Sequence, residues 1–191
     1  MTLATRLTVG RIVLAPIFFI LYQIAARGEV FFVVTVWAIF LLMEASDLLD
    51  GHFARLFRQE SELGKILDPF ADAISRLTYF ICFSGSGILP LWILLILVYR
   101  DVAVAYIRVI LSQNRLSLAA RVSGKIKAWI YGVAGAGGIV VFSLGKMNWA
   151  ADSILVAERI ALVLFIAAAG VALWSLIDYG LFFLNYFRKS C

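Results

Sequence analysis

The sequence predicts an all-α integral membrane protein, a bundle of six transmembrane helices formed by a single domain over residues 1–191. Hydrophobic residues make up 63% of the chain and charged residues only 15%, whereas a soluble domain is nearer half apolar and a quarter charged. The apolar residues also recur along the whole chain, with a mean hydropathy of +0.98. Since no long linker or low-complexity segment divides these stretches, we expect one domain.

Six stretches are long enough to cross a bilayer, which requires about 20 mostly apolar residues per helix. The first is interpreted as a retained span, because it lacks a small-residue cleavage site followed by a polar mature domain. The sixth is longer than a bilayer requires, so we expect it to tilt or to continue as a helix into the cytoplasm. The small residues of the fifth, GVAGAGG at 132–138, are typical of close helix packing. The predicted spans are residues 8–27, 30–49, 67–88, 90–112, 126–146 and 156–187.

The lysines and arginines indicate which side of the membrane each connection faces. Most of the 17 would lie on one side if the N-terminus were cytoplasmic, as the positive-inside rule requires. This distribution predicts an N-in, C-in topology and a cytoplasmic connection between the second and third spans. The net charge of +5 then reflects topology and contact with anionic membrane lipids, and we expect no nucleic-acid partner.

Four aspartates stand at helical spacing within DLLDGHFARLFRQESELGKILDPFAD, residues 47–72. Asp47 and Asp50 are three residues apart, and Asp68 and Asp72 are four apart, so each pair shares one face of a helix. Carboxylate oxygens suit hard divalent cations such as Mg²⁺ or Mn²⁺. Four carboxylates could hold two such ions, as in two-metal phosphoryl chemistry.

Small residues and an arginine accompany the aspartates. Gly51, Ala54 and Gly64 leave room for a bulky ligand to approach the backbone. Arg55 can form paired hydrogen bonds with a phosphate group. Solvated loop charges would be the simplest alternative, but so regular a set at helix ends in an apolar chain is costly unless it has a function. We therefore expect a metal-bound phosphate ester at this site.

These eight positions match the pattern D-x2-D-G-x2-A-R-x8-G-x3-D-x3-D, and through it the chain resembles the CDP-alcohol phosphatidyltransferases. The resemblance implies that a CDP-linked lipid, CDP-diacylglycerol, passes its phosphatidyl group to an alcohol and releases CMP. It implies that Asp72 is the general base that accepts the proton of the acceptor hydroxyl. It further implies a homodimer, and the small size of the chain indicates a prokaryotic cytoplasmic (inner) membrane, with the active site facing the cytoplasm. The metal ligands implied are Asp47, Asp50, Asp68 and Asp72, and the nucleotide-binding residues are Asp47, Gly51, Ala54, Arg55 and Gly64.

Basic residues between positions 99 and 127 indicate the acceptor. So many cations near the cytoplasmic side suit a small alcohol that carries its own phosphate, and the positive-inside rule explains the deeper Arg100 poorly. Their order, and the N-terminal Thr8, Arg11 and Pro16, are similar to the phosphatidylglycerophosphate synthases of the family, whose acceptor is sn-glycerol 3-phosphate. The residues expected to bind the acceptor phosphate are Arg100, Arg108, Lys125 and Lys127.

Three alternatives stay open. The same chemistry could use another acceptor, namely inositol phosphate, inositol or serine. Carboxylates at helix ends also occur in cation transporters, although such proteins place polar residues near the bilayer midplane and often contain inverted repeats. A catalytically inactive lipid-binding protein is the third alternative, but it would not need all four aspartates and Arg55.

Overall fold

Six α-helices account for nearly all of the chain. The computed structural model describes residues 3–28, 30–57, 62–113 and 122–190. Each predicted span corresponds to one helix in these ranges, so the all-α prediction is confirmed. The helices are α1 (Leu3–Ala26), α2 (Phe31–Phe57), α3 (Glu62–Gly85), α4 (Leu91–Gln113), α5 (Val122–Lys146) and α6 (Ala151–Ser190).

Three helices of the described ranges are long and apolar enough to cross a membrane by length and composition. The stretches are Thr8–Ala26 in α1, Val122–Lys146 in α5 and Ala151–Asn185 in α6. Their length and composition are those of a membrane protein. Whether α2, α3 and α4 also cross stays a prediction, and these are the helices that carry most of the charged residues discussed below.

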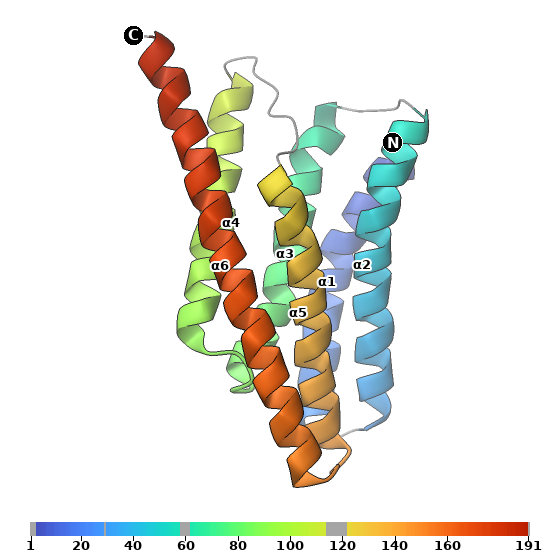
Figure 1. Ribbon diagram of the computed structural model, residues 1–191. Coiled ribbons are helices and arrows are strands. Elements are labelled where there is room, and N and C mark those ends of the chain that lie inside the picture. Colours follow the sequence, from blue (N-terminus) through green and yellow to red (C-terminus); the bar gives the residue numbers. More distant parts are fainter. Residues whose placement is uncertain (1–2, 29, 58–61, 114–121, 191) are drawn as a thin grey trace.

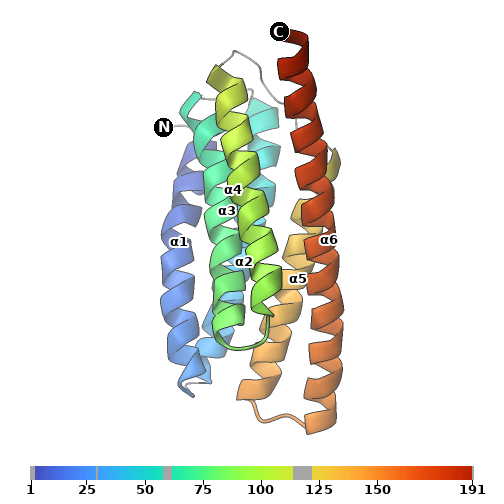
Figure 2. The same ribbon diagram turned by 90° about the vertical axis from the view of Figure 1, so that its left-hand side faces the viewer.

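The helices run alternately up and down, so both termini lie at the same end of the bundle (Figure 1). α1 packs against α2 and α3, while α6 packs against α4 and α5. α3 joins these two groups through its contacts with α4 and α5. The 40 residues of α6 span about 60 Å at the helical rise per residue. In both views α6 extends past its neighbours at the end that carries the termini (Figures 1 and 2).

Aromatic side chains fill much of the core between the helices. The rings of Tyr22 and Phe142 stack with centroids 4.1 Å apart, and Phe80 contacts both Tyr79 at 4.7 Å and Tyr131 at 5.4 Å. Such pairs each add about 0.5–1.5 kcal/mol beyond the burial of their area. Because the five rings come from α1, α3 and α5, they fix the relative positions of these helices.

Glycines allow α5 to approach α2 and α3 closely, as the small residues at 132–138 predict. A Cβ atom at Gly135 would lie 2.9 Å from the ring of Phe40 and 3.0 Å from that of Tyr79. A Cβ atom at Gly138 would meet the ring of Phe83 more closely still. The prediction of close helix packing is therefore confirmed, and this contact brings the middle of α5 against α2 and α3.

Candidate active site

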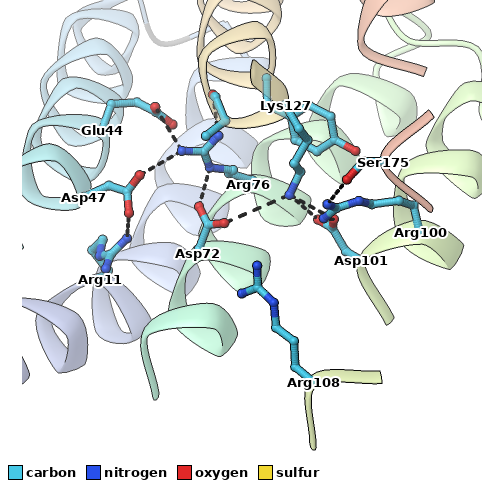
Figure 3. Close-up of polar contacts among 12 residues, drawn as sticks. Arg11, Glu44, Asp47, Asp72, Arg76, Arg100, Asp101, Arg108, Lys127 and Ser175 are labelled. Carbon is cyan, nitrogen blue, oxygen red and sulfur yellow. Dashed lines mark hydrogen bonds and ion pairs between the residues drawn. The ribbon is translucent and has the colours of Figure 1, made fainter. Parts of the chain in front are cut away.

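A network of charged side chains connects all six helices. Figure 3 shows its charged members pointing toward one another from helices that are far apart in the sequence. Each of the three aspartates lies between two cations, and this alternation offsets the cost of burying so many charges. We call this set the polar network: Arg11, Asp47, Asp72, Arg76, Arg100, Asp101, Lys127 and Ser175.

Arg76 contacts one aspartate from each pair of the motif, Asp47 on α2 and Asp72 on α3. It lies one turn after Asp72 on α3, and its Nε is 2.5 Å from Asp72 Oδ1. Its Nη2 donates a hydrogen bond to Asp47 Oδ2 on α2 at 2.8 Å, and its Nη1 donates to the Ala128 carbonyl on α5 at 2.5 Å. Only 3% of the Arg76 side chain is exposed. This arginine therefore ties α2, α3 and α5 together at the site.

Asp47 is held by a second arginine. Arg11 of α1 pairs through Nη1 with Asp47 Oδ1, so both oxygens of this carboxylate contact a guanidinium group. The Arg11 side chain is 2% exposed and that of Asp47 is 28% exposed. Glu44, one turn before Asp47 on α2, places its Oε2 3.8 Å from Arg76 Nη2. The carboxylates on this face of α2 are thus oriented by arginines from two other helices.

Lys127 continues the network from α3 to α4. Its Nζ lies 4.0 Å from Asp72 Oδ2 and 2.9 Å from Asp101 Oδ1. Arg100 pairs with Asp101 at 2.8 Å and donates a hydrogen bond to Ser175 Oγ of α6 at 2.6 Å. Arg100, Asp101 and Lys127 are all almost fully buried. Buried charges need partners of this kind, and here each one has them.

A small pocket opens beside this part of the network, with a volume of about 50 Å³. Three cations and two carboxylates line it, so a bound anion would meet an excess of positive charge. We call it the basic pocket. Its lining residues are Pro69, Asp72, Ala73, Arg100, Asp101, Val104, Ala105, Arg108, Gly124 and Lys127. Figure 3 shows the Arg108 side chain extending toward the network from its own helix.

A larger cavity of about 250 Å³ lies on the other side of Arg76, between α2, α3 and α5. Glu44, Asp47 and Arg76 are its charged lining, and the remaining lining is mostly apolar. We call it the apolar cavity. Its other lining residues are Phe40, Ala128, Trp129, Gly132, Val133 and Ala136. Asp72 and Arg76, which contact each other, therefore face two different cavities.

The sequence-predicted residues fall into three groups. Asp47 and Asp72 are brought together through Arg76, and Arg100, Arg108 and Lys127 line the basic pocket with Asp72. Lys125 is exposed on α5 and does not line that pocket. For the rest, the backbone lies in α2 or α3 but the side-chain placement is outside what the structure describes. These residues are Asp50, Gly51, Ala54, Arg55, Gly64 and Asp68.

Asp47 and Asp72 supply carboxylate oxygens, the donor type that hard divalent cations prefer. Among the described side chains, no three histidines, cysteines, aspartates or glutamates are close enough to surround one ion. Asp47 and Asp72 would need the carboxylates of Asp50 and Asp68 beside them. The backbone of these two residues lies in α2 and α3, about one helical turn along the chain from Asp47 and Asp72.

Several residues of the site were not predicted. Arg76 carries a usable signal, because an ionisable residue within an apolar span is costly and indicates a function. Glu44 carried a weaker signal, its spacing of three residues from Asp47. Ser175 and Tyr179 carried none, because they reach the site only through the packing of α6 on α4 and α5.

Comparison with known proteins assigns the chain to a family. Residues 1–184 match the family model described as CDP-alcohol phosphatidyltransferase. The chain is 30% identical over 153 residues to a CDP-diacylglycerol–glycerol-3-phosphate 3-phosphatidyltransferase of Treponema pallidum, covering 75% of this chain and 68% of the relative. The protein of the same name from Bacillus subtilis is 29% identical over 136 residues, covering 66% of this chain and 70% of the relative. A cardiolipin synthase (CMP-forming) of Streptomyces coelicolor is 42% identical over 67 residues, covering 34% and 31%.

Proposed function

The chain belongs to the CDP-alcohol phosphatidyltransferase family, and from this premise we propose that it transfers the phosphatidyl group of CDP-diacylglycerol to sn-glycerol 3-phosphate. CMP is released and phosphatidylglycerophosphate is the product. The names of the Treponema and Bacillus relatives support this acceptor. The observation that carries the proposal is the position of Asp72. This residue lines the basic pocket, and it also contacts Arg76, which in turn contacts Asp47.

Proteins of this family generally depend on divalent metal ions, and the donor set of this chain fits them. Two ions, Mg²⁺ or Mn²⁺, would be held by Asp47, Asp50, Asp68 and Asp72. When bound, they would offset negative charge on the pyrophosphate and on the departing CMP. Arg76 and Arg11 orient Asp47, and Arg76 orients Asp72. Such outer partners hold ligating carboxylates in the required direction.

The donor lipid is placed by the motif residues of α2 and α3. Gly51, Ala54, Arg55 and Gly64, with Asp47, would line the site of the cytidine nucleotide. Asp47 also lines the apolar cavity, so the nucleotide end of the lipid would lie at the boundary between charged and apolar surfaces.

The acceptor enters the basic pocket. Its phosphate binds Arg100, Arg108 and Lys127, and its hydroxyl points to Asp72. Lys125, which the sequence also predicts to bind this phosphate, is exposed and lies outside the pocket lining. Arg76 Nε lies 2.5 Å from Asp72 Oδ1, whereas Asp72 Oδ2 lies 4.0 Å from Lys127 Nζ. Oδ2 is therefore the oxygen that accepts the hydroxyl proton. The hydroxyl oxygen forms a bond to the phosphorus that carries diacylglycerol, the bond from that phosphorus to CMP breaks, and CMP leaves with the electron pair.

A different acceptor is the main competing proposal, and the similarity to a cardiolipin synthase supports it. The basic pocket argues for a small phosphorylated alcohol, because its volume is about 50 Å³ and its lining carries three cations. Inositol phosphate, inositol and serine are the other acceptors to be compared.

The proposed setting is the prokaryotic cytoplasmic membrane. All six helices would cross it, with the termini and the active site on the cytoplasmic side. The positive-inside distribution of basic residues supports this orientation, as does the position of both termini at one end of the bundle. Resemblance to the family supports a homodimer.

CMP release by the purified protein in detergent tests the proposed reaction. The assay contains CDP-diacylglycerol and Mg²⁺ or Mn²⁺, and compares sn-glycerol 3-phosphate with inositol phosphate, inositol, serine and phosphatidylglycerol. We expect release with sn-glycerol 3-phosphate and little with the others. Release with a different acceptor would keep the family chemistry and contradict the acceptor, whereas silence with all five would contradict the reaction.

A further inference from the structure

Part of one face of α6 lies directly behind the basic pocket. Ser175, Asp178 and Tyr179 are three and four residues apart and therefore share this face. Ser175 accepts a hydrogen bond from Arg100 Nη2 at 2.6 Å, and Asp178 accepts one from Ser123 Oγ at 2.7 Å. α6 thus contacts α4 and α5 at the place where these two helices form the pocket.

Tyr179 contacts both arginines of the pocket. Its side chain is fully buried. Its hydroxyl accepts a hydrogen bond from Arg108 Nη2 at 3.0 Å. Its ring centroid lies 5.4 Å from Arg108 Cζ and 5.9 Å from Arg100 Cζ, within the range of cation–π attraction. Tyr179 does not itself line the pocket. It therefore contacts the two arginines without occupying the space where a ligand would bind.

The two arginines need such support for different reasons. Arg100 already pairs with a carboxylate, that of Asp101. Arg108 pairs with no carboxylate among the described residues, and it donates a hydrogen bond to the Tyr179 hydroxyl instead. Two guanidinium groups near one ring also repel each other. A long, unsupported arginine has many rotamers, and ordering it when a ligand binds costs free energy.

We propose that Tyr179 is a positioning residue that holds Arg100 and Arg108 as a pair, oriented to bind the phosphate group of the acceptor. This inference rests on the proposed function. Guanidinium groups match the oxygens of a phosphate with paired hydrogen bonds, and a pair held in advance binds with a smaller loss of side-chain freedom. The residue therefore acts on acceptor binding rather than on the transfer step.

Gly124 supports the same assignment. It lines the basic pocket, and a Cβ atom at this position would lie 3.3 Å from the Tyr179 hydroxyl. Glycine therefore leaves the hydroxyl room to stay beside Arg108. Gly124→Ala should displace that hydroxyl by a few tenths of an ångström and weaken the same interaction, without altering Tyr179.

Steady-state kinetics of Tyr179→Phe in the full-length protein test this role, because the ring is kept and only the hydroxyl is lost. We expect the KM for sn-glycerol 3-phosphate to rise about three- to tenfold, which corresponds to the loss of one ordinary hydrogen bond. We expect kcat and the KM for CDP-diacylglycerol to stay within about a factor of two. The control is Tyr106→Phe on α4, where the side chain is 68% exposed; it should leave all three constants unchanged.

A second readout follows phosphate binding alone. Inorganic phosphate should inhibit competitively against the acceptor, and its inhibition constant should rise in Tyr179→Phe and Gly124→Ala by the same factor as the KM. A residue that only stabilised the fold would lower kcat or the unfolding temperature without this parallel rise.

An unchanged KM and inhibition constant in Tyr179→Phe, with wild-type protein active on sn-glycerol 3-phosphate, would overturn the role of Tyr179 alone. If Tyr179→Phe does not fold, the same result in Gly124→Ala would overturn it. Wild-type protein that uses no phosphorylated acceptor would overturn both the proposed function and this inference.

Discussion

Asp72 contacts different partners through its two oxygens, and its proposed role as the general base depends on this difference. Oδ1 is held by Arg76 on its own helix, while Oδ2 faces Lys127 and the basic pocket. One carboxylate can therefore be fixed in direction and still accept a proton. Arg76 has a complementary role, because among the described side chains it is the one cation that contacts both Asp47 and Asp72.

Replacing Asp72 by asparagine should abolish turnover. The amide keeps the size of the side chain but cannot act as a base, and general-base catalysis contributes about 100- to 10,000-fold to a rate. CMP release by Asp72→Asn should fall by at least about 100-fold. Asp152→Asn, at an exposed position at the start of α6, is the control and should retain full activity. Activity near wild type in Asp72→Asn would exclude Asp72 as the base.

Replacing Arg76 by glutamine should weaken metal dependence and stability together. Loss of an outer partner of ligating carboxylates costs about 10- to 100-fold in metal affinity or activity, so the Mg²⁺ concentration for half-maximal activity should rise by about that factor. Removing one member of a buried ion pair also destabilises by about 3 kcal/mol. Metal titration of activity and thermal unfolding in detergent measure these two effects. Arg159→Gln, at an exposed position of α6, should change neither; equal behaviour of the two variants would contradict the role of Arg76.

At the scale of helices, the close approach of α5 to α2 and α3 holds the site together. Gly138 is the tightest point of this contact, since a Cβ atom would meet the Phe83 ring. Gly138→Ala should therefore lower the free energy of unfolding by about 1–3 kcal/mol, as overpacking does. Gly145→Ala on the same helix meets open space and should be neutral or stabilising by up to about 1 kcal/mol. Thermal unfolding of the two variants compares them, and similar unfolding temperatures would contradict the packing argument.

The helices could be predicted because long apolar runs signal them directly. The aspartate motif could be recognised because its residues are close in sequence, and its role in metal binding stays a prediction. The rest of the site could not be predicted. Arg11 and Asp47 are 36 residues apart, and Arg100 and Ser175 are 75 apart. Contacts over such separations depend on how the helices pack, and one sequence carries no local signal for them. A tyrosine such as Tyr179 in the last predicted span is also typical of a membrane interface, so its type alone does not indicate a site.

For the whole molecule, the up-and-down topology predicts that both termini lie on one side of the membrane if all six helices cross. Reporter fusions at each terminus, one active only in the cytoplasm and one active only outside it, measure this directly. We expect both termini to be cytoplasmic, with the polar network on the same side. Termini on opposite sides would show that an odd number of helices crosses the membrane.

The central claim is that this bundle joins the phosphatidyl group of CDP-diacylglycerol to glycerol 3-phosphate across Asp72. The most direct measurement is the transfer of label from radiolabelled sn-glycerol 3-phosphate into chloroform-extractable lipid by purified protein with CDP-diacylglycerol and Mg²⁺ or Mn²⁺. We expect labelled phosphatidylglycerophosphate in amounts equal to the CMP released, and none with Asp72→Asn. CMP release without label in the lipid would contradict it, because the phosphatidyl group would then have passed to another acceptor.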